Sequence, residues 1–331
     1  MKYSVLSTLL FVLLVSCATS PPPTLDLSPT PLAVQTSTPA SPAEPTTSIP
    51  SEIPTSTPQA LVPNFEYIVI IMFENKEFGS VIGNPEMPIY NKLAREYTLL
   101  TQYYAIRHPS LPNYIALMGG DIFGISSNCQ DCFIDAPSLP DLIEQSGRTW
   151  KTYQEDMPEP CFLGSTNLYA QKHNPLVYFD PIRLNPERCQ RSVVPLKVLP
   201  LDIATNSLPN FFFIKPNICN DSHDCSLDIS DTWLTNLLNV LIPALDATAK
   251  PYFVAMLFEE GQGDHTCCGL PEPGGGRVPM VLYSPLVKNG FEDPTPYTHY
   301  SLLKTISESW GLEYLGHAAE DNHALIVAPW K

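Results

Sequence analysis

Four continuous apolar runs limit the folds open to this chain more strongly than any other feature of its sequence. They lie at residues 67–73, 211–214, 251–258 and 278–283. Continuous apolar runs bounded by turn residues are typical of strands buried on both faces, as in a parallel sheet covered by helices. Helical periodicity appears between and after the runs, as at residues 231–245 and 300–310. The alternation predicts a doubly wound α/β fold with a mainly parallel sheet sandwiched by helices.

The helical segment at 231–245 begins at a residue that can cap a helix and has one apolar face. Ser230 or Asp231 can cap its N-terminus, because short polar side chains accept hydrogen bonds from the first backbone N–H groups. The apolar residues that fall on one stripe are Trp233, Leu237, Leu238 and Leu241. The segment therefore supplies one of the helices expected between the strands.

The first 63 residues have the composition of a targeting segment followed by a spacer. An apolar run at residues 5–15 follows Lys2 and is too short for a membrane anchor, which predicts a signal peptide over residues 1–17. The run ends in Leu-Val-Ser-Cys, which resembles a bacterial lipobox and predicts a lipid anchor at Cys17. A plain secretory signal with an unrelated cysteine is the alternative. We expect an exported protein, lipid-anchored on the outer face of a bacterial membrane.

Residues 18–63 contain 12 Pro and 16 Ser or Thr and no Lys or Arg. Such a segment cannot bury a core, so it predicts a disordered, semi-rigid stalk. Residues 64–331 are long enough for one sizeable domain. The net charge is −16, of which residues 1–63 carry −2, leaving −14 on the folded domain. This charge argues against nucleic-acid binding through phosphate contacts. It would also repel an anionic substrate unless a bound cation offsets it locally.

Nine cysteines are present, and eight remain when Cys17 is set aside. An even number in an exported chain predicts disulfides. The expected local pairs are Cys129/Cys132, Cys161/Cys189 and Cys219/Cys225, while Cys267 and Cys268 require either a vicinal bridge or partners elsewhere. Zinc at the first pair is a weak alternative, because no second, similarly spaced pair lies nearby.

Three of the apolar runs end in loops that begin with carboxylate, amide or imidazole groups. The first leads into Glu74 and Asn75, the second toward residues 217–224, and the third into Glu259 and Glu260. Ligands of open α/β sheets bind outside the carboxyl ends of the strands, so these groups are expected to share one site. A strand-ending turn and a solvated loop are the alternatives for the individual pairs. The oxygen-rich set predicts one divalent cation, which could be Mg²⁺, Mn²⁺, Ca²⁺ or Zn²⁺.

Residues 107–114, Arg-His-Pro-Ser-Leu-Pro-Asn-Tyr, place a hydroxyl beside an imidazole and a carboxamide on a proline-bracketed turn. This string resembles the bacterial phosphoesterase family of acid phosphatases and phospholipases C, within the alkaline-phosphatase superfamily. Residues 73–76, 217–225, 274–279 and 299–303 resemble further segments of that family. The resemblance covers nearly all of residues 65–317.

The resemblance implies a site in which Ser110 is the nucleophile. The residues implied around one metal ion are Glu74, Asn75, Ser110, Glu259 and Glu260. Those implied near the phosphate are Asn113 and the histidines His108, His223, His265 and His299. His223 is the first candidate for the general acid, with His265 and His299 as further ones. The family usually has Asp where Glu259 stands, so the carboxylate here reaches one methylene further. His173, His317 and His323 match no motif and are interpreted as structural.

Three functions are compatible with these residues. The first is metal-dependent hydrolysis of phosphate monoesters through a phosphoseryl intermediate on Ser110, as in acid phosphatases. The second is the same chemistry on a diester, as in a phospholipase C that acts on phospholipid head groups. The third is a non-catalytic envelope lipoprotein that binds a ligand. No basic amphipathic helix is present to meet a membrane, and the serine argues for catalysis, so we favour the first.

Overall fold

A computed structural model of the protein describes residues 60–331. The predicted signal peptide over residues 1–17, the lipobox with Cys17 and all but the last four residues of the predicted stalk lie outside the described residues. Packing begins at Val62, which is buried, and the Pro63 carbonyl accepts a hydrogen bond of 2.8 Å from Ser309 Oγ. The folded domain therefore starts two residues before the predicted boundary at residue 64.

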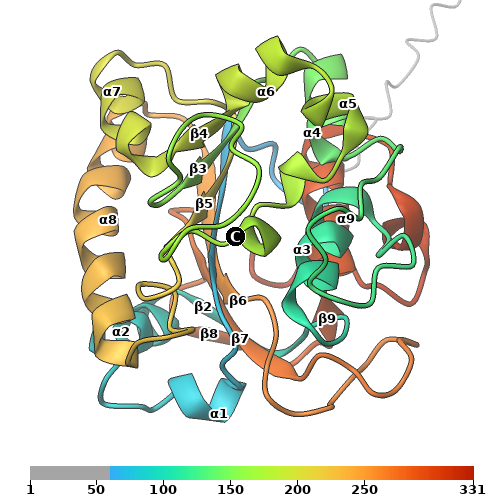
Figure 1. The fold of residues 1–331 in the computed structure, drawn as a ribbon. Coiled ribbons are helices and arrows are strands. Elements are labelled where there is room, and N and C mark those ends of the chain that lie inside the picture. Colours follow the sequence, from blue (N-terminus) through green and yellow to red (C-terminus); the bar gives the residue numbers. More distant parts are fainter. Residues whose placement is uncertain (1–59) are drawn as a thin grey trace, which may run out of the picture. The chain divides into compact units, whose positions relative to one another are not determined.

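A nine-stranded sheet forms the centre of the domain (Figure 1), in the order β4-β3-β5-β1-β6-β7-β2-β8, with β9 paired to β2. The strands are β1 Tyr67–Phe73, β2 Thr98–Tyr104, β3 Trp150–Gln154, β4 Val193–Pro195, β5 Phe211–Lys215, β6 Tyr252–Phe258, β7 Arg277–Tyr283, β8 Phe291–Asp293 and β9 Tyr297–Thr298. Only β7 runs against its neighbours β6 and β2, so the sheet is mainly parallel.

Helices cover both faces of this sheet. The α-helices are α1 Phe78–Val81, α2 Pro88–Glu96, α3 Ser110–Gly119, α4 Leu139–Gln145, α5 Asp180–Arg183, α6 Pro186–Ser192, α7 Leu199–Ala204, α8 Leu227–Ala247 and α9 His299–Trp310. Residues 60–331 also contain four short 3₁₀ turns, which are η1 Gln171–His173, η2 Pro175–Val177, η3 Leu196–Val198 and η4 Gly316–Ala319. Figure 1 shows α2, α7 and α8 on one side of the sheet and α3, α4 and α9 on the other. The doubly wound α/β prediction is confirmed.

The four predicted apolar runs are β1, β5, β6 and β7, and β1, β5 and β6 are adjacent in the sheet. Their side chains are buried almost throughout, because helices cover both faces. Register aligns Ile71 with Ile214 and Phe73 with Phe258, so the carboxyl ends of these parallel strands meet at one edge. The loops that follow them start close together.

Helix α8 starts earlier than predicted. Its first residue is Leu227 and its N-cap is Ser226, so neither Ser230 nor Asp231 is the cap. Asp231 instead accepts hydrogen bonds from the backbone N–H groups of Ile89 and Tyr90 in the first turn of α2, at 2.8–3.1 Å. Its carboxylate caps a neighbouring helix across the layer.

Four disulfides are present in the described chain, and all the expected local pairs are confirmed. They are Cys129–Cys132, Cys161–Cys189, Cys219–Cys225 and the vicinal pair Cys267–Cys268. The zinc alternative for the first pair is wrong, because those sulfurs are bonded to each other.

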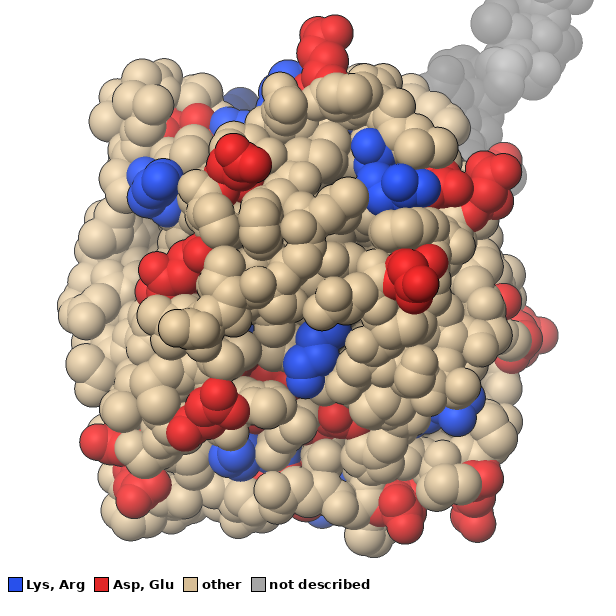
Figure 2. All heavy atoms as spheres, in the orientation of Figure 1, with Lys and Arg blue, Asp and Glu red and all other residues tan. Residues whose placement is uncertain are grey.

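Charged side chains are scattered over the face shown in Figure 2, and no basic patch forms on it. Among residues 60–331, no helix has the length and apolar character needed to span a membrane.

Candidate active site

The turn before α3 is held in shape by Asn113. Its Oδ1 accepts hydrogen bonds from the backbone N–H groups of Ile106 (2.8 Å) and Arg107 (3.2 Å), and its Nδ2 donates to the Arg107 carbonyl at 2.6 Å. Asn113 is fully buried, so both ends of its amide are committed to the backbone. In this structure the residue shapes the loop that carries Ser110, and its contact with phosphate stays a prediction.

Ser110 is the first residue of α3 and lies among the carboxylates at the sheet edge. Its Oγ donates to Glu260 Oε1 at 3.0 Å and lies 3.3 Å from Glu74 Oε2. Glu74 follows β1 directly and Glu260 follows β6 by one residue, so the hydroxyl joins three segments that are distant in sequence. Both carboxylates and the hydroxyl are buried.

Asn75 sits next to the same group. Its backbone has a φ of 44°, a left-handed conformation that asparagine tolerates, and its N–H donates to Glu259 Oε2 at 3.1 Å. One terminal atom of its amide lies 2.6 Å from Glu259 Oε1 and 3.0 Å from Glu260 Oε1. Two arrangements satisfy this contact. Either the amide nitrogen donates to both carboxylates, or the amide oxygen and the carboxylates face a shared cation.

The two oxygens of Glu74 have different surroundings. Oε2 faces Ser110, whereas Oε1 accepts a hydrogen bond from Tyr114 Oη, lies 3.1 Å from His173 Nε2 and lies 3.6 Å from Lys215 Nζ. Lys215 also contacts Asp221 Oδ2 at 2.5 Å. Sequence reasoning missed Tyr114 and Lys215. It interpreted His173 as structural, and the structure places this buried ring beside Glu74.

Electrostatics divides the buried groups into ionised and neutral members. Burial opposes ionisation of Glu74, yet His173 and Lys215 beside it hold the pKa of its carboxyl well below its usual range. Burial lowers the pKa of His173 to about 3, so the ring is neutral near pH 7. Burial raises the pKa of Asp221 to about 6, against the opposing effect of Lys215.

The carboxyl groups after β6 are crowded. Burial and the adjacent charges of Glu74 and Glu260 raise the pKa of Glu259 well above its usual value, and burial with Glu74 also raises the pKa of Glu260. Burial alone would lower the pKa of His108, but its contacts with Glu260 Oε2 (2.5 Å) and the Gly263 carbonyl (3.1 Å) outweigh this and raise it. A cationic His108 would therefore offset part of the acidic charge.

The three candidate catalytic histidines are placed differently. His223 is about one-third exposed, and its Nδ1 contacts Asp224 Oδ1 at 2.6 Å. His265 is largely exposed, and its Nδ1 lies 3.9 Å from Glu77 Oε1, away from the carboxylates around Ser110. His299 is fully buried. Its Nε2 donates to the Glu259 carbonyl at 2.7 Å, so its Nδ1 accepts from Tyr103 Oη at 3.0 Å.

His299 therefore supports the backbone of Glu259 and reaches no open surface. Burial lowers its pKa to about 4, which keeps the ring neutral near pH 7. This placement does not suit the predicted role of proton donor to a substrate, because neither ring nitrogen is free. Of the three, only His223 lies near the lysine that contacts Ser110. Its Nδ1 contacts Asp224, and its Nε2 contacts neither a carboxylate nor the backbone.

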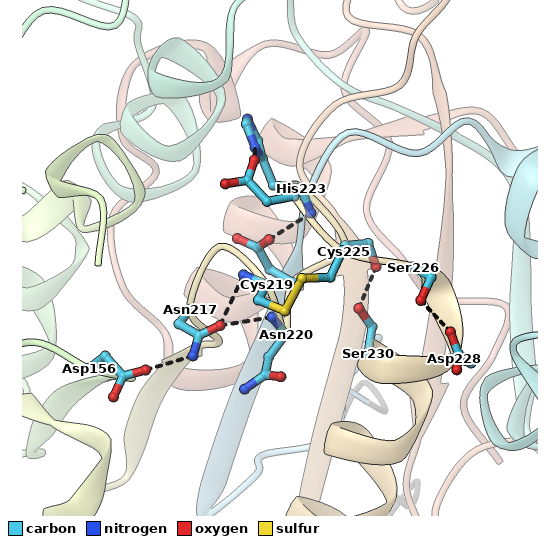
Figure 3. Close-up of a disulfide and its surroundings, with 12 residues drawn as sticks. Asp156, Asn217, Cys219, Asn220, His223, Cys225, Ser226, Asp228 and Ser230 are labelled. Atoms are coloured by element: carbon cyan, nitrogen blue, oxygen red, sulfur yellow. Dashed lines mark hydrogen bonds and ion pairs between the residues drawn. A yellow bond between two sulfur atoms is a disulfide. The ribbon is translucent and has the colours of Figure 1, made fainter. Parts of the chain in front are cut away.

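A disulfide loop presents His223. Cys219 and Cys225 close the loop, and Asn217 Oδ1 accepts from the N–H groups of Cys219 (3.0 Å) and Asn220 (2.8 Å). Figure 3 shows His223 projecting from this loop, with its backbone N–H directed at a carboxylate, which is Asp221 Oδ1 at 2.8 Å. The imidazole thus extends from a cross-linked base.

Two overlapping sets of residues have the chemistry to hold a cation. Ligand atoms of Glu74, His173 and Asp221 lie within 4.8 Å of one another in a buried group. The Lys215 ammonium already neutralises this side, since it lies 2.5 Å from Asp221. The other set, on the Ser110 side, has crowded carboxylates and the Asn75 amide, and the basic side chains at its margin are His108 beside Glu260 and Lys172 beside Ser110. Its members are Glu74, Asn75, Ser110, Glu259 and Glu260, and their oxygen donors fit a divalent cation.

Few sequence signals mark the residues that were missed. Lys215 stands out as a charged residue that ends an otherwise apolar strand. Tyr114 lies four residues after Ser110, hence on the same face of α3. Lys172 and His173 lie in a loop without periodicity, so only the fold brings them to the site. Lys172 Nζ is 3.5 Å from Ser110 Oγ and 3.4 Å from His223 Nε2.

Solved structures share this fold at low sequence identity. An alkaline-phosphatase-superfamily protein from Vibrio parahaemolyticus superposes with a TM-score of 0.51, at 12% identity, over 79% of this chain and 71% of that one. The fold is therefore alkaline-phosphatase-like. The model of the phosphoesterase family matches residues 84–313, and the chain belongs to this family.

Two curated relatives support the assignment. The phosphate-repressible acid phosphatase of Penicillium chrysogenum is 35% identical over 263 residues, which is 76% of this chain and 60% of that protein. The phosphatidylinositol-3-phosphatase of Mycobacterium tuberculosis is 31% identical over 266 residues, 78% of this chain and 81% of that protein. The chain spans 55–63% of the length of the fungal and yeast acid phosphatases it matches.

Proposed function

We propose that the protein is a phosphoric ester hydrolase that cleaves phosphate monoesters through nucleophilic attack by Ser110. The observation that carries the proposal is the contact of Ser110 Oγ with the carboxylates of Glu74 and Glu260 at the first turn of α3. Helix N-termini stabilise anions, so this position suits a phosphoryl group. Family membership and the acid phosphatases among its relatives also support the proposal.

In the first step, Ser110 Oγ forms a bond to phosphorus while the bond to the leaving alkoxide breaks. The serine proton passes to Glu260 Oε1, 3.0 Å away. The alkoxide takes a proton from His223 Nε2, since Asp224 holds the Nδ1 side of that ring. Water then attacks the phosphoserine from the opposite face, gives its proton to His223, and the serine oxygen regains its proton from Glu260.

A divalent cation held by Glu74, Asn75, Glu259 and Glu260 would lower the pKa of the Ser110 hydroxyl and offset the negative charge of the substrate. The chain's own residues set the geometry around it. Tyr114, Lys215 and His173 fix one oxygen of Glu74 and leave the other facing the serine. His108 holds the far oxygen of Glu260. The hydroxyl is thereby confined between two oriented carboxylates.

The test is turnover of p-nitrophenyl phosphate and bis(p-nitrophenyl) phosphate by wild type, Ser110→Ala and the control Ser126→Ala, which changes an exposed serine. We expect turnover of the monoester by wild type and the control, loss of turnover in Ser110→Ala, and loss of wild-type activity in chelator with recovery on adding a divalent cation. Acid quench and mass spectrometry should find phosphate on the Ser110 peptide.

Retained activity in Ser110→Ala would exclude the covalent route. Turnover of the diester alone would favour the second function, hydrolysis of a diester as in a phospholipase C. Absence of turnover on either ester by a folded, metal-loaded protein would favour a ligand-binding lipoprotein.

We also propose that the protein is exported and lipid-anchored at Cys17, on the strength of the apolar run and lipobox-like sequence alone. Fractionation of cells that express wild type or Cys17→Ser is the test. Wild type should partition with membranes and the variant should not. Equal partitioning of the two would contradict the anchor.

A further inference from the structure

Lys172 is a basic side chain that the proposed reaction has not yet used. It belongs to η1 between two buried residues, Gln171 and His173, and is itself half-buried. Gln171 fixes the turn, because its Oε1 accepts from the Gly164 N–H at 2.6 Å and its Nε2 donates to the Gln130 carbonyl at 2.8 Å. The lysine therefore extends from an anchored backbone.

Its ammonium lies over the nucleophile. Lys172 Nζ is 3.5 Å from Ser110 Oγ and 3.4 Å from His223 Nε2, so it stands between the proposed attacking oxygen and the proposed proton donor. A phosphoryl group bound to Ser110 must lie within a few ångströms of the same point. The position places the ammonium where non-bridging oxygens of the substrate would be.

Lys172 forms no ion pair with a carboxylate in the described chain, although its charge contributes to the lowered pKa of Glu74. The other lysine of the site, Lys215, is buried and pairs with Asp221 at 2.5 Å and Glu74 at 3.6 Å. Within residues 60–331, no ion pair of 4.0 Å or less involves Lys172. Lys215 is thus neutralised internally, whereas the Lys172 ammonium lies beside Ser110 Oγ and His223 Nε2, in a domain with a net charge of −14.

We propose that Lys172 binds a non-bridging phosphoryl oxygen and makes the site selective for phosphate monoesters over diesters. This inference rests on the proposed function. A monoester near neutral pH carries a second negative charge and three non-bridging oxygens, whereas a diester carries one charge and two such oxygens. An ammonium fixed beside the reacting phosphorus attracts the dianion more strongly, and the gain is large where water is partly excluded.

The test compares wild type, Lys172→Met, Lys172→Arg and the surface control Lys92→Met on p-nitrophenyl phosphate and bis(p-nitrophenyl) phosphate. Lys172→Met should lower kcat/KM for the monoester by about 10²-fold. The loss on the diester should be about tenfold smaller, so the ratio of the two kcat/KM values falls by about one order of magnitude. Lys172→Arg, which keeps the charge, should retain most of the monoester preference, and Lys92→Met should behave like wild type.

Equal losses on both esters would overturn the proposal, because they would mean that Lys172 only positions Ser110 or the loop. An unchanged monoester rate in Lys172→Met would overturn it as well. Thermal unfolding of each variant verifies that the fold is intact.

A second readout separates this inference from the proposed function. If wild type turns over neither ester, the hydrolase proposal fails, and calorimetric titration with inorganic phosphate still tests the lysine. We expect Lys172→Met to bind phosphate about tenfold more weakly than wild type. Equal affinity would exclude Lys172 from anion binding.

Discussion

Glu74 does two tasks with its two oxygens. Oε1 is held by Tyr114, His173 and Lys215, and Oε2 faces the Ser110 hydroxyl. A carboxylate fixed on one side keeps a constant orientation on the other, which is the requirement for a group that must hold a cation or a nucleophile. The residues behind Glu74 therefore matter to the chemistry although no substrate can touch them.

The variant Tyr114→Phe tests whether the tyrosine hydroxyl is needed to orient Glu74. The variant keeps the buried ring and removes the hydrogen bond to Glu74 Oε1. We expect kcat/KM on p-nitrophenyl phosphate to fall by about 10-fold or more, with a comparable loss of divalent-cation affinity in calorimetry. Tyr252→Phe is the control, because its hydroxyl donates to Asp246 at the opposite end of β6. Wild-type kinetics in Tyr114→Phe would show that Glu74 needs no such support.

The buried ring of His323 should make the free energy of unfolding depend on pH. The ring is buried against Thr298, and burial lowers its pKa to about 4. An unfolded histidine has a pKa of about 6.5, so the unfolded chain binds the proton more tightly. Stability contributed by the neutral ring is complete above about pH 6.5 and is lost as the pH falls toward 4.

The measurement is urea unfolding of wild type and His323→Gln between pH 7.5 and 4. The free energy of unfolding should fall less in the variant, by about 1–3 kcal/mol over this range. Parallel curves for wild type and His323→Gln would contradict the assignment.

The site residues that could be predicted from sequence are those next to strand ends or within the serine turn. Glu74 and Glu260 follow apolar runs whose carboxyl ends must meet, so their proximity was predictable from fold rules. Lys172 and His173 come from a loop whose path depends on tertiary packing. Asn113 lies in the right motif, but its hydrogen bonds to the turn depend on local backbone geometry that residue types do not reveal.

At the scale of elements, the apolar strands β1, β5, β6 and β7 were predictable and the other strands were not. The runs that became β1, β5 and β6 are apolar on both faces because helices cover them. β2 contains Thr101 and Gln102 at partly exposed positions, and β8 and β9 have only three and two residues. Short or half-polar strands owe their pairing to neighbours in the sheet, so their own sequences give little signal.

Helix α2 depends on a carboxylate from α8. Asp231→Ala should leave the N–H groups of Ile89 and Tyr90 without an acceptor and lower the free energy of unfolding by about 1–2 kcal/mol. The specific activity of the folded fraction should be unchanged. Chemical denaturation is the measurement, with Asp228→Ala, at an exposed position in the first turn of α8, as the control. A loss no greater than that of the control would show that water replaces the cap.

At the scale of the whole molecule, the disulfides should stabilise the domain unequally. Cys161–Cys189 closes a loop of 28 residues and Cys129–Cys132 one of three. Longer loops lose more unfolded-state entropy, so replacing both cysteines by serine should cost about 3–4 kcal/mol in the first case and about 2 kcal/mol in the second. Denaturant unfolding of the two double variants gives the comparison. The reverse order would mean that native-state contacts, and not chain entropy, determine the effect.

The antiparallel strand β7 has a consequence for how this domain can diversify. The chain leaves β6 after Phe258, forms the loop of residues 261–276 and returns to the neighbouring position in the sheet. Gly261 N–H donates to the Gly275 carbonyl at 2.7 Å and closes the base of that loop. Segments of other lengths could therefore be grafted between these glycines without shifting any strand. A replacement segment would have to keep a carbonyl at the place of Gly263, because His108 contacts it at 3.1 Å while holding Glu260 beside the catalytic hydroxyl.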